Sequence, residues 1–151
     1  MIPRYTRPEM GKIWTDQRKF ETWLRIELVV CEALSQLGEI PAEVVREIKE
    51  KASFDIHHID EIEKVTKHDV LAFLTNVGES IGPLSRYLHY GLTSSDILDT
   101  SLALLLKEAS ELILQDIHRL LEVLKRKAFQ YKETLMIGRS HGIHAEPITF
   151  G

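Results

Sequence analysis

The feature that most constrains this chain is a run of 46 residues, from 92 to 137, that contains neither glycine nor proline. Apolar residues recur within it at steps of three and four, which predicts one helix over about residues 96–131. Such a helix would be roughly 54 Å long, whereas a compact domain of 151 residues has a radius of gyration of about 15 Å. The helix is therefore expected to extend beyond any single core that this chain can build.

The first half of this helix is apolar on several sides, and a helix that is apolar nearly all round is buried nearly all round. The remaining residues are too few to cover it. We therefore expect that other subunits cover the helix or that the chain is the front part of a longer protein. The apolar ending at residues 147–151, which has no capping residue and no polar tail, favours truncation.

Shorter helices are expected before the long one. Thr15 is a typical N-cap, and an apolar stripe from Phe20 to Leu37, which includes Trp23, is followed by Gly38, a typical C-terminal glycine. Trp14 and Trp23 are interpreted as core residues. The predicted helices cover about residues 16–37, 42–52, 56–66 and 69–81.

The tail from residue 135 onward shows only short β-prone pieces and no convincing strand pattern. The predicted class is all-α. We expect an N-terminal helical domain at residues 1–92 and the start of a central helical-bundle domain at residues 93–151.

Composition excludes several functions. The 19 basic and 23 acidic residues are interspersed, with a formal charge of −4, which disfavours bulk binding of nucleic acid. No apolar run is long enough to span a membrane, and the N-terminus lacks the apolar core of a secretory signal. Cys31 is the single cysteine, which excludes an intramolecular disulfide and a cysteine-cluster metal site. These features predict a cytoplasmic protein in a reducing setting.

The densest polar cluster lies between Gly138 and Pro147 and contains two histidines, one arginine, one serine and one glutamate. Histidine titrates near neutrality, which suits general acid or base catalysis. The alternative is a solvated connector. His141 and His144 form half of a metal site at best, because the usual zinc signatures use cysteines or helical histidines at i and i+4. No metal is predicted.

Two further groups are candidates for binding an anion. Lys67, His68 and Asp69 precede a predicted helix whose N-terminal N–H groups can bind negative charge. Arg4 beside Tyr5 is a reasonable contact for a phosphate or a base. The alternatives are ordinary helix capping for the first group and a disordered end for the second.

Residues 93–96 fit a capping box, with Thr93 as the N-cap and Asp96 at the third helical position. Capping alone explains this pattern. A functional interpretation uses the additional hydroxyl of Ser94, so that two hydroxyls and the helix N-terminus bind a carboxylate. His89, four residues upstream of Thr93, is placed to join them.

Taken in order, these groups resemble four motifs of the fumarase/aspartase superfamily. Residues 138–151 (GRSHGIHAEPITFG) resemble one of them, and the segment GIHAEP is similar to the version found in the adenylosuccinate lyase branch. Residues 89–100 (HYGLTSSDILDT), 67–73 (KHDVLAF) and 4–14 are similar to the other three. Two positions depart from the family pattern, because Ser140 and Ile148 stand where threonine is usual.

The resemblance implies a β-elimination that converts adenylosuccinate into AMP and fumarate, and a second one on the succinyl-aminoimidazole carboxamide ribotide of purine biosynthesis. It implies no metal, nucleotide cofactor or prosthetic group. It also implies a homotetramer whose active sites combine residues of three subunits. The family's mobile loop, with the serine that acts as base, is expected beyond residue 151, so the fragment alone is expected to be inactive.

The resemblance also implies roles for individual residues. His141 is the expected general acid, which protonates the departing nitrogen. The other expected site residues contact the substrate. Thr93 and Ser94 are expected at a carboxylate, and the hydroxyl of Ser140 preserves a hydrogen bond. The nucleotide, succinyl and phosphate portions are assigned to Lys67, His68, Asp69, Arg4, Tyr5 and, as a second phosphate contact, His89.

Three alternatives stay open. A sister lyase, of the argininosuccinate lyase or fumarase type, shares the elimination and differs in the leaving group. A non-enzymatic helical oligomerisation module explains the long helix but not four polar motifs in order. A histidine-based metalloprotein is the third.

Overall fold

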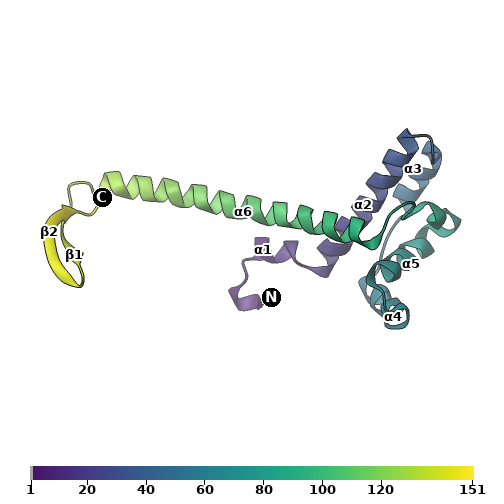
Figure 1. Ribbon diagram of the computed structural model, residues 1–151, viewed down its shortest axis with the longest axis horizontal. Helices are drawn as coiled ribbons and strands as arrows, with labels where there is room; N and C mark the ends of the chain where they lie inside the picture. Colours follow the sequence, from purple (N-terminus) through teal and green to yellow (C-terminus); the bar gives the residue numbers. More distant parts are fainter. Residues whose placement is uncertain (1) are drawn as a thin grey trace. The chain divides into compact units, whose positions relative to one another are not determined.

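The computed structural model describes residues 2–151 (Figure 1), and its elements are mostly helical. This confirms the all-α class. The helical elements are η1 (Pro3–Tyr5), α1 (Pro8–Ile13), α2 (Asp16–Gln36), α3 (Ala42–Lys51), α4 (Ile56–Thr66), α5 (Asp69–Ile81), η2 (Gly82–Tyr87) and α6 (Ser94–Gln130). Two strands, β1 (Leu135–Ser140) and β2 (Ile143–Thr149), follow. The chain divides into two compact units, Met1–Ala109 and Ser110–Gly151.

The short helices of the first unit begin and end where local chemistry predicts. The Thr15 hydroxyl accepts a hydrogen bond from the Arg18 N–H at 3.2 Å and caps α2. The Asp55 carboxylate accepts one from the His58 N–H at 2.8 Å and caps α4. Gly38 has φ +80°, a left-handed conformation that glycine adopts without steric cost. The expected spans of α4 and α5 are confirmed to the residue.

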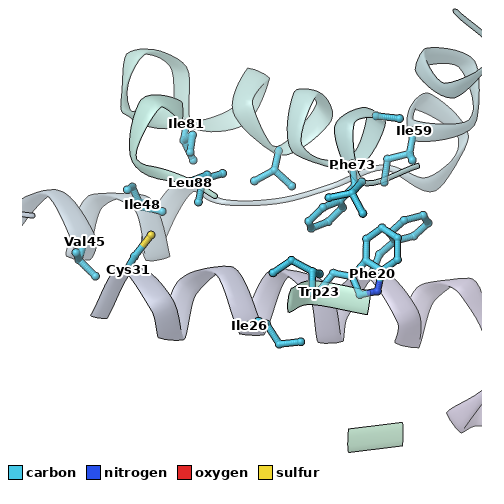
Figure 2. Close-up of a cluster of buried hydrophobic side chains, with 14 of the residues drawn as sticks. Phe20, Trp23, Ile26, Cys31, Val45, Ile48, Ile59, Phe73, Ile81 and Leu88 are labelled. Carbon is cyan, nitrogen blue, oxygen red and sulfur yellow. The ribbon is translucent and has the colours of Figure 1, made fainter. Parts of the chain in front are cut away.

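The core of the first unit is centred on aromatic side chains of α2 and α5 (Figure 2). Phe20 stacks on Phe73 with ring centroids 5.6 Å apart, and Trp23 meets Phe73 edge to face at 5.5 Å. The expectation that Trp14 lies in the core is wrong, because Trp14 is 39% exposed. It follows the short helix α1 rather than lying on the buried stripe of α2.

The beginning of α6 is joined to α2 by one buried polar contact. The Trp23 indole Nε1–H donates to the Ser101 hydroxyl at 3.0 Å, and both side chains are buried. The Ser101 hydroxyl in turn donates to the Leu98 carbonyl at 3.1 Å. Near the end of this unit, the Arg18 guanidinium pairs with Glu108 of α6. These contacts hold the first turns of α6 on the core of the first unit.

Within the second unit, α6 carries many apolar side chains that are about half exposed. They are Ile113, Leu114, Ile117, Leu120, Leu121, Val123 and Leu124. Charged residues are interleaved with them, and no helix within residues 2–151 has the length and apolar character needed to cross a membrane.

The expectation that the tail has no strand is wrong. β1 and β2 pair antiparallel, and His141 and Gly142 form the turn, with φ of +52° and +76°. Two positive φ angles in a two-residue turn are typical of type I′, whose twist matches that of paired strands. At Gly138 the register shifts, and an added Cβ there would lie 2.8 Å from the Glu146 carbonyl. The strands are nearly all exposed, so the period-2 burial pattern that marks a strand in sequence is missing.

Candidate active site

Unusual backbone conformations coincide with the predicted site residues. In residues 2–151, the non-glycine residues with positive φ are Lys67 (54°), His89 (58°) and His141 (52°). All three were singled out from the sequence as substrate-binding or catalytic. A side chain in the left-handed region costs energy that the surrounding structure must offset, and such positions concentrate at functional sites.

Lys67 and His68 form the junction between α4 and α5. Lys67 ends α4 in the left-handed conformation, and His68 is the N-cap of α5. The His68 Nδ1 accepts a hydrogen bond from the Leu71 N–H at 3.3 Å, which requires a lone pair on that nitrogen. The neutral ring therefore carries its proton on Nε2, which lies 3.5 Å from the Ser94 hydroxyl. Two of the predicted motifs, 26 residues apart, thus meet here.

Asp69 belongs to the same junction. Its Oδ1 accepts a hydrogen bond from the Val70 N–H at 2.7 Å and lies 3.6 Å from the His68 Nδ1. His68 and Asp69 both cap α5, so the alternative of ordinary capping is met by the geometry. Both side chains nevertheless remain about half exposed, which leaves their outer edges accessible to a ligand.

Thr93 and Asp96 form half of the expected capping box. The Thr93 N–H and hydroxyl both donate to the Asp96 Oδ2, at 2.7 and 3.1 Å. The reciprocal bond is missing, since the Asp96 N–H bonds to the Thr93 carbonyl instead of the hydroxyl. Donation from the Thr93 N–H and hydroxyl holds the pKa of Asp96 below its ordinary value, with a smaller contribution from the charge of His89. Ser94, by contrast, keeps its hydroxyl for the contact with His68.

His89 is held by Glu27, a residue that the sequence analysis did not single out. Its main-chain N–H donates to the Glu27 Oε2 at 2.8 Å, and its ring Nδ1 lies 2.6 Å from the Glu27 Oε1. Glu27 is on α2 and is fully buried. The sequence signal was its position, because Glu27 lies four residues after Trp23 and four before Cys31, both of which are core residues. A carboxylate at such a position requires a buried partner.

Arg4 and Tyr5 lie together in η1. The Arg4 guanidinium carbon is 4.7 Å from the centre of the Tyr5 ring, and both residues are exposed. Among the described residues, neither makes a hydrogen bond or ion pair with the other predicted site residues.

Ser140 and His141 lie in the hairpin of the second unit. Ser140 is the last residue of β1 and pairs with Ile143, while His141 occupies the first turn position. Both side chains are exposed. His141 has a φ of +52°, which is uncommon for residues other than glycine, although histidine adopts it more often than most.

Within residues 2–151, no three His, Cys, Asp or Glu side chains converge as a metal site would require. The chemistry present is that of histidine, hydroxyl, carboxylate and cationic groups. Such a set can bind anions and transfer protons.

The helical scaffold of this chain is similar to those of solved enzymes. A fumarate lyase from Mesorhizobium sp. BNC1 has a TM-score of 0.86 and 25% identity, over 93% of this chain and 34% of that one. A 3-carboxy-cis,cis-muconate lactonizing enzyme from Pseudomonas putida has a TM-score of 0.85 and 28% identity, over 96% of this chain and 35% of that one. The class is therefore the fumarate lyase type of helical fold.

The chain belongs to the Lyase family, whose model matches residues 4–151. Curated relatives include adenylosuccinate lyases from Synechocystis sp., 58% identical, and Bacillus subtilis, 53% identical, each over the whole of this chain. The chain spans about a third of their length, 35% in both cases. The resemblance found in the sequence motifs is confirmed.

Proposed function

We propose that this chain is the N-terminal third of an adenylosuccinate lyase, which eliminates fumarate from adenylosuccinate and from the corresponding succinyl-aminoimidazole carboxamide ribotide. The observation that carries the proposal is the identity of 53–58% to adenylosuccinate lyases over every residue of the chain. The contact between His68 and Ser94 supports it, because it brings two predicted substrate-binding motifs together.

The proposed chemistry requires a base, an acid and groups that stabilise negative charge. Removing a proton beside a carboxylate builds negative charge on that carboxylate, which hydroxyls and helix N–H groups stabilise. Thr93 and Ser94, at the start of α6, supply such groups. His141 is proposed to protonate the departing nitrogen, with Ser140 as its hydroxyl neighbour. The base is proposed to lie on a segment beyond residue 151, so that residues 1–151 alone have no lyase activity.

The remaining site residues are proposed to bind the substrate. Lys67, His68 and Asp69 hold the nucleotide and succinyl portions. Arg4 and Tyr5 contact the nucleotide end, and His89 contacts an anionic group. No cofactor or metal takes part.

We further propose a cytoplasmic homotetramer in purine and AMP biosynthesis, with active sites shared between subunits. The exposed apolar residues of α6 from Ile113 to Leu124 support a role in assembly, since a surface of this kind is normally covered. Residues 1–92 are proposed as the N-terminal domain and residues 93–151 as the start of the central bundle.

The test is fumarate release from adenylosuccinate by the full-length protein, with residues 1–151 alongside. His141→Ala is expected to slow the full-length protein by about 100- to 10,000-fold, the usual contribution of a general acid. His118→Ala, an exposed histidine on α6 outside the motifs, is the matched control and is expected to change the rate less than twofold. An unchanged rate for His141→Ala would remove the assignment of the acid. Turnover of argininosuccinate or malate instead would identify a sister lyase, and no turnover of any of them would favour an oligomerisation module.

A further inference from the structure

The contact between Glu27 and His89 joins a buried carboxylate to a strained turn. Glu27 is fully buried on α2, whereas the His89 side chain retains 21% exposure. One carboxylate receives two hydrogen bonds from the same residue, at 2.8 Å from the main chain and at 2.6 Å from the ring. The two residues are 62 positions apart, so this contact anchors the segment that leads into α6 onto the core helix α2.

The two hydrogen bonds determine how the imidazole is presented. A carboxylate only accepts hydrogen bonds, so the His89 Nδ1 must carry a proton directed at Glu27. Within residues 2–151, no hydrogen bond involves the other ring nitrogen, Nε2. In the protonated ring both nitrogens donate, Nδ1 to Glu27 and Nε2 to a group outside.

The other groups around this pair do not replace either partner. The Cys31 thiol lies close enough for the Glu27 charge to help raise its pKa, to about 11, although burial contributes more. The charge of His89 contributes to the lowered pKa of Asp96, but the Asp96 carboxylate already accepts hydrogen bonds from Thr93. Among the described residues, His89 is thus the basic side chain that pairs with Glu27.

We propose that Glu27 is a positioning residue for substrate binding, which holds His89 in its left-handed turn and presents Nε2 to an anionic group of the substrate. This inference rests on the proposed function, because the lyase substrate carries both phosphate and carboxylate groups. A bound anion and Glu27 contact the same imidazole ring from opposite sides, so Glu27 affects binding without touching the substrate.

Glu27→Gln in the full-length protein is the informative change, because it keeps the shape of the side chain. The main-chain N–H of His89 can only donate, so it donates to the side-chain amide oxygen of the glutamine. The amide NH₂ then faces Nδ1, which must accept instead of donate. The ring reverses its neutral tautomer and loses its charged partner.

The expected result is a KM for adenylosuccinate that rises about five- to tenfold, with kcat changed less than threefold. The reversed tautomer still donates from Nε2, but as a neutral group, so the expected change is the difference between a charge-assisted and a neutral hydrogen bond. Inhibition by inorganic phosphate and by succinate is measured in parallel. Weaker inhibition by phosphate assigns Nε2 to the phosphate end, and weaker inhibition by succinate assigns it to a carboxylate. Unchanged KM and unchanged inhibition by both anions would overturn the proposal.

The double variant Glu27→Gln/His89→Ala tests whether Glu27 acts through His89. We expect its KM to equal that of His89→Ala within twofold. Multiplied losses would show that Glu27 acts by another route and would refute the positioning role. Thr22→Val is the matched control, since Thr22 is a buried polar residue of the same helix whose hydroxyl, within residues 2–151, bonds only to the Arg18 carbonyl. Its KM is expected to stay at the wild-type value.

One further measurement keeps the proposal falsifiable if Glu27→Gln does not fold. His89→Ala with wild-type KM and wild-type phosphate and succinate inhibition would refute the proposal by itself. The proposed function fails separately, when the wild-type full-length protein releases no fumarate from adenylosuccinate. The positioning role fails when the wild type is active and the variants bind both anions normally.

Discussion

The buried hydrogen bond between Trp23 and Ser101 is expected to determine how firmly the start of α6 is held. Ser101→Ala removes the acceptor of an indole N–H whose side chain is only 2% exposed. A buried donor left without a partner costs about 1–3 kcal/mol. This corresponds to a rise of about five- to 150-fold in the constant for local opening. The lost hydroxyl itself is small, so a cavity contributes little.

Hydrogen–deuterium exchange of the full-length protein measures this opening locally. Peptides that cover residues 97–105 of α6 and the facing part of α2 are expected to exchange faster in Ser101→Ala by that factor. Ser110→Ala, an exposed serine of the same helix, is the control and is expected to leave exchange unchanged. In a double-mutant cycle with Trp23→Phe, the two changes are expected to couple by about 1 kcal/mol. Exchange that is equal in Ser101→Ala and Ser110→Ala would refute the argument.

Three further predictions concern the surroundings of the site. Burial raises the pKa of the Cys31 thiol to about 11. The native protein is therefore expected to resist iodoacetamide at pH 8, and rapid labelling of the native protein would contradict this. It is also expected to lose stability between about pH 9 and 11, where only the thiol of the unfolded chain ionises. Lys67→Gly is expected to be more stable than Lys67→Ala by about 0.5–1 kcal/mol in thermal unfolding. Glycine relieves the left-handed strain at φ 54°, which outweighs its cost in unfolded-state entropy. Both variants are expected to raise KM. The pKa of Asp96 is lowered from 3.8 by bonds from Thr93, so its contribution to stability is present above that pH and is lost as the pH falls through the lower folded-state pKa. Asp96→Asn should accordingly lower the unfolding temperature at pH 7 and have no effect at a pH below the folded-state pKa of Asp96. An equal effect at both pH values would show that the charge is irrelevant.

Most helix boundaries could be predicted from the sequence because capping and periodicity are local. Thr15 and Asp55 bond to N–H groups three residues ahead, and these bonds involve only neighbouring positions. The long helix followed from the same kind of reasoning, and its observed end at Gln130 is one residue from the expected one. The hairpin after residue 135 was missed, since its strands lack a buried face and its turn uses histidine and glycine rather than a common turn pair.

The candidate site likewise has features that could be predicted from the sequence and features that depend on tertiary packing. The sequence by itself determined the identities of the site residues, their order in four motifs and the helix starts that carry them. Only the tertiary structure decided that the His68 ring faces Ser94 and that His89 is held by Glu27. The physical reason is distance along the chain. These partners are 26 and 62 residues apart, and the tertiary packing of the first unit brings them together.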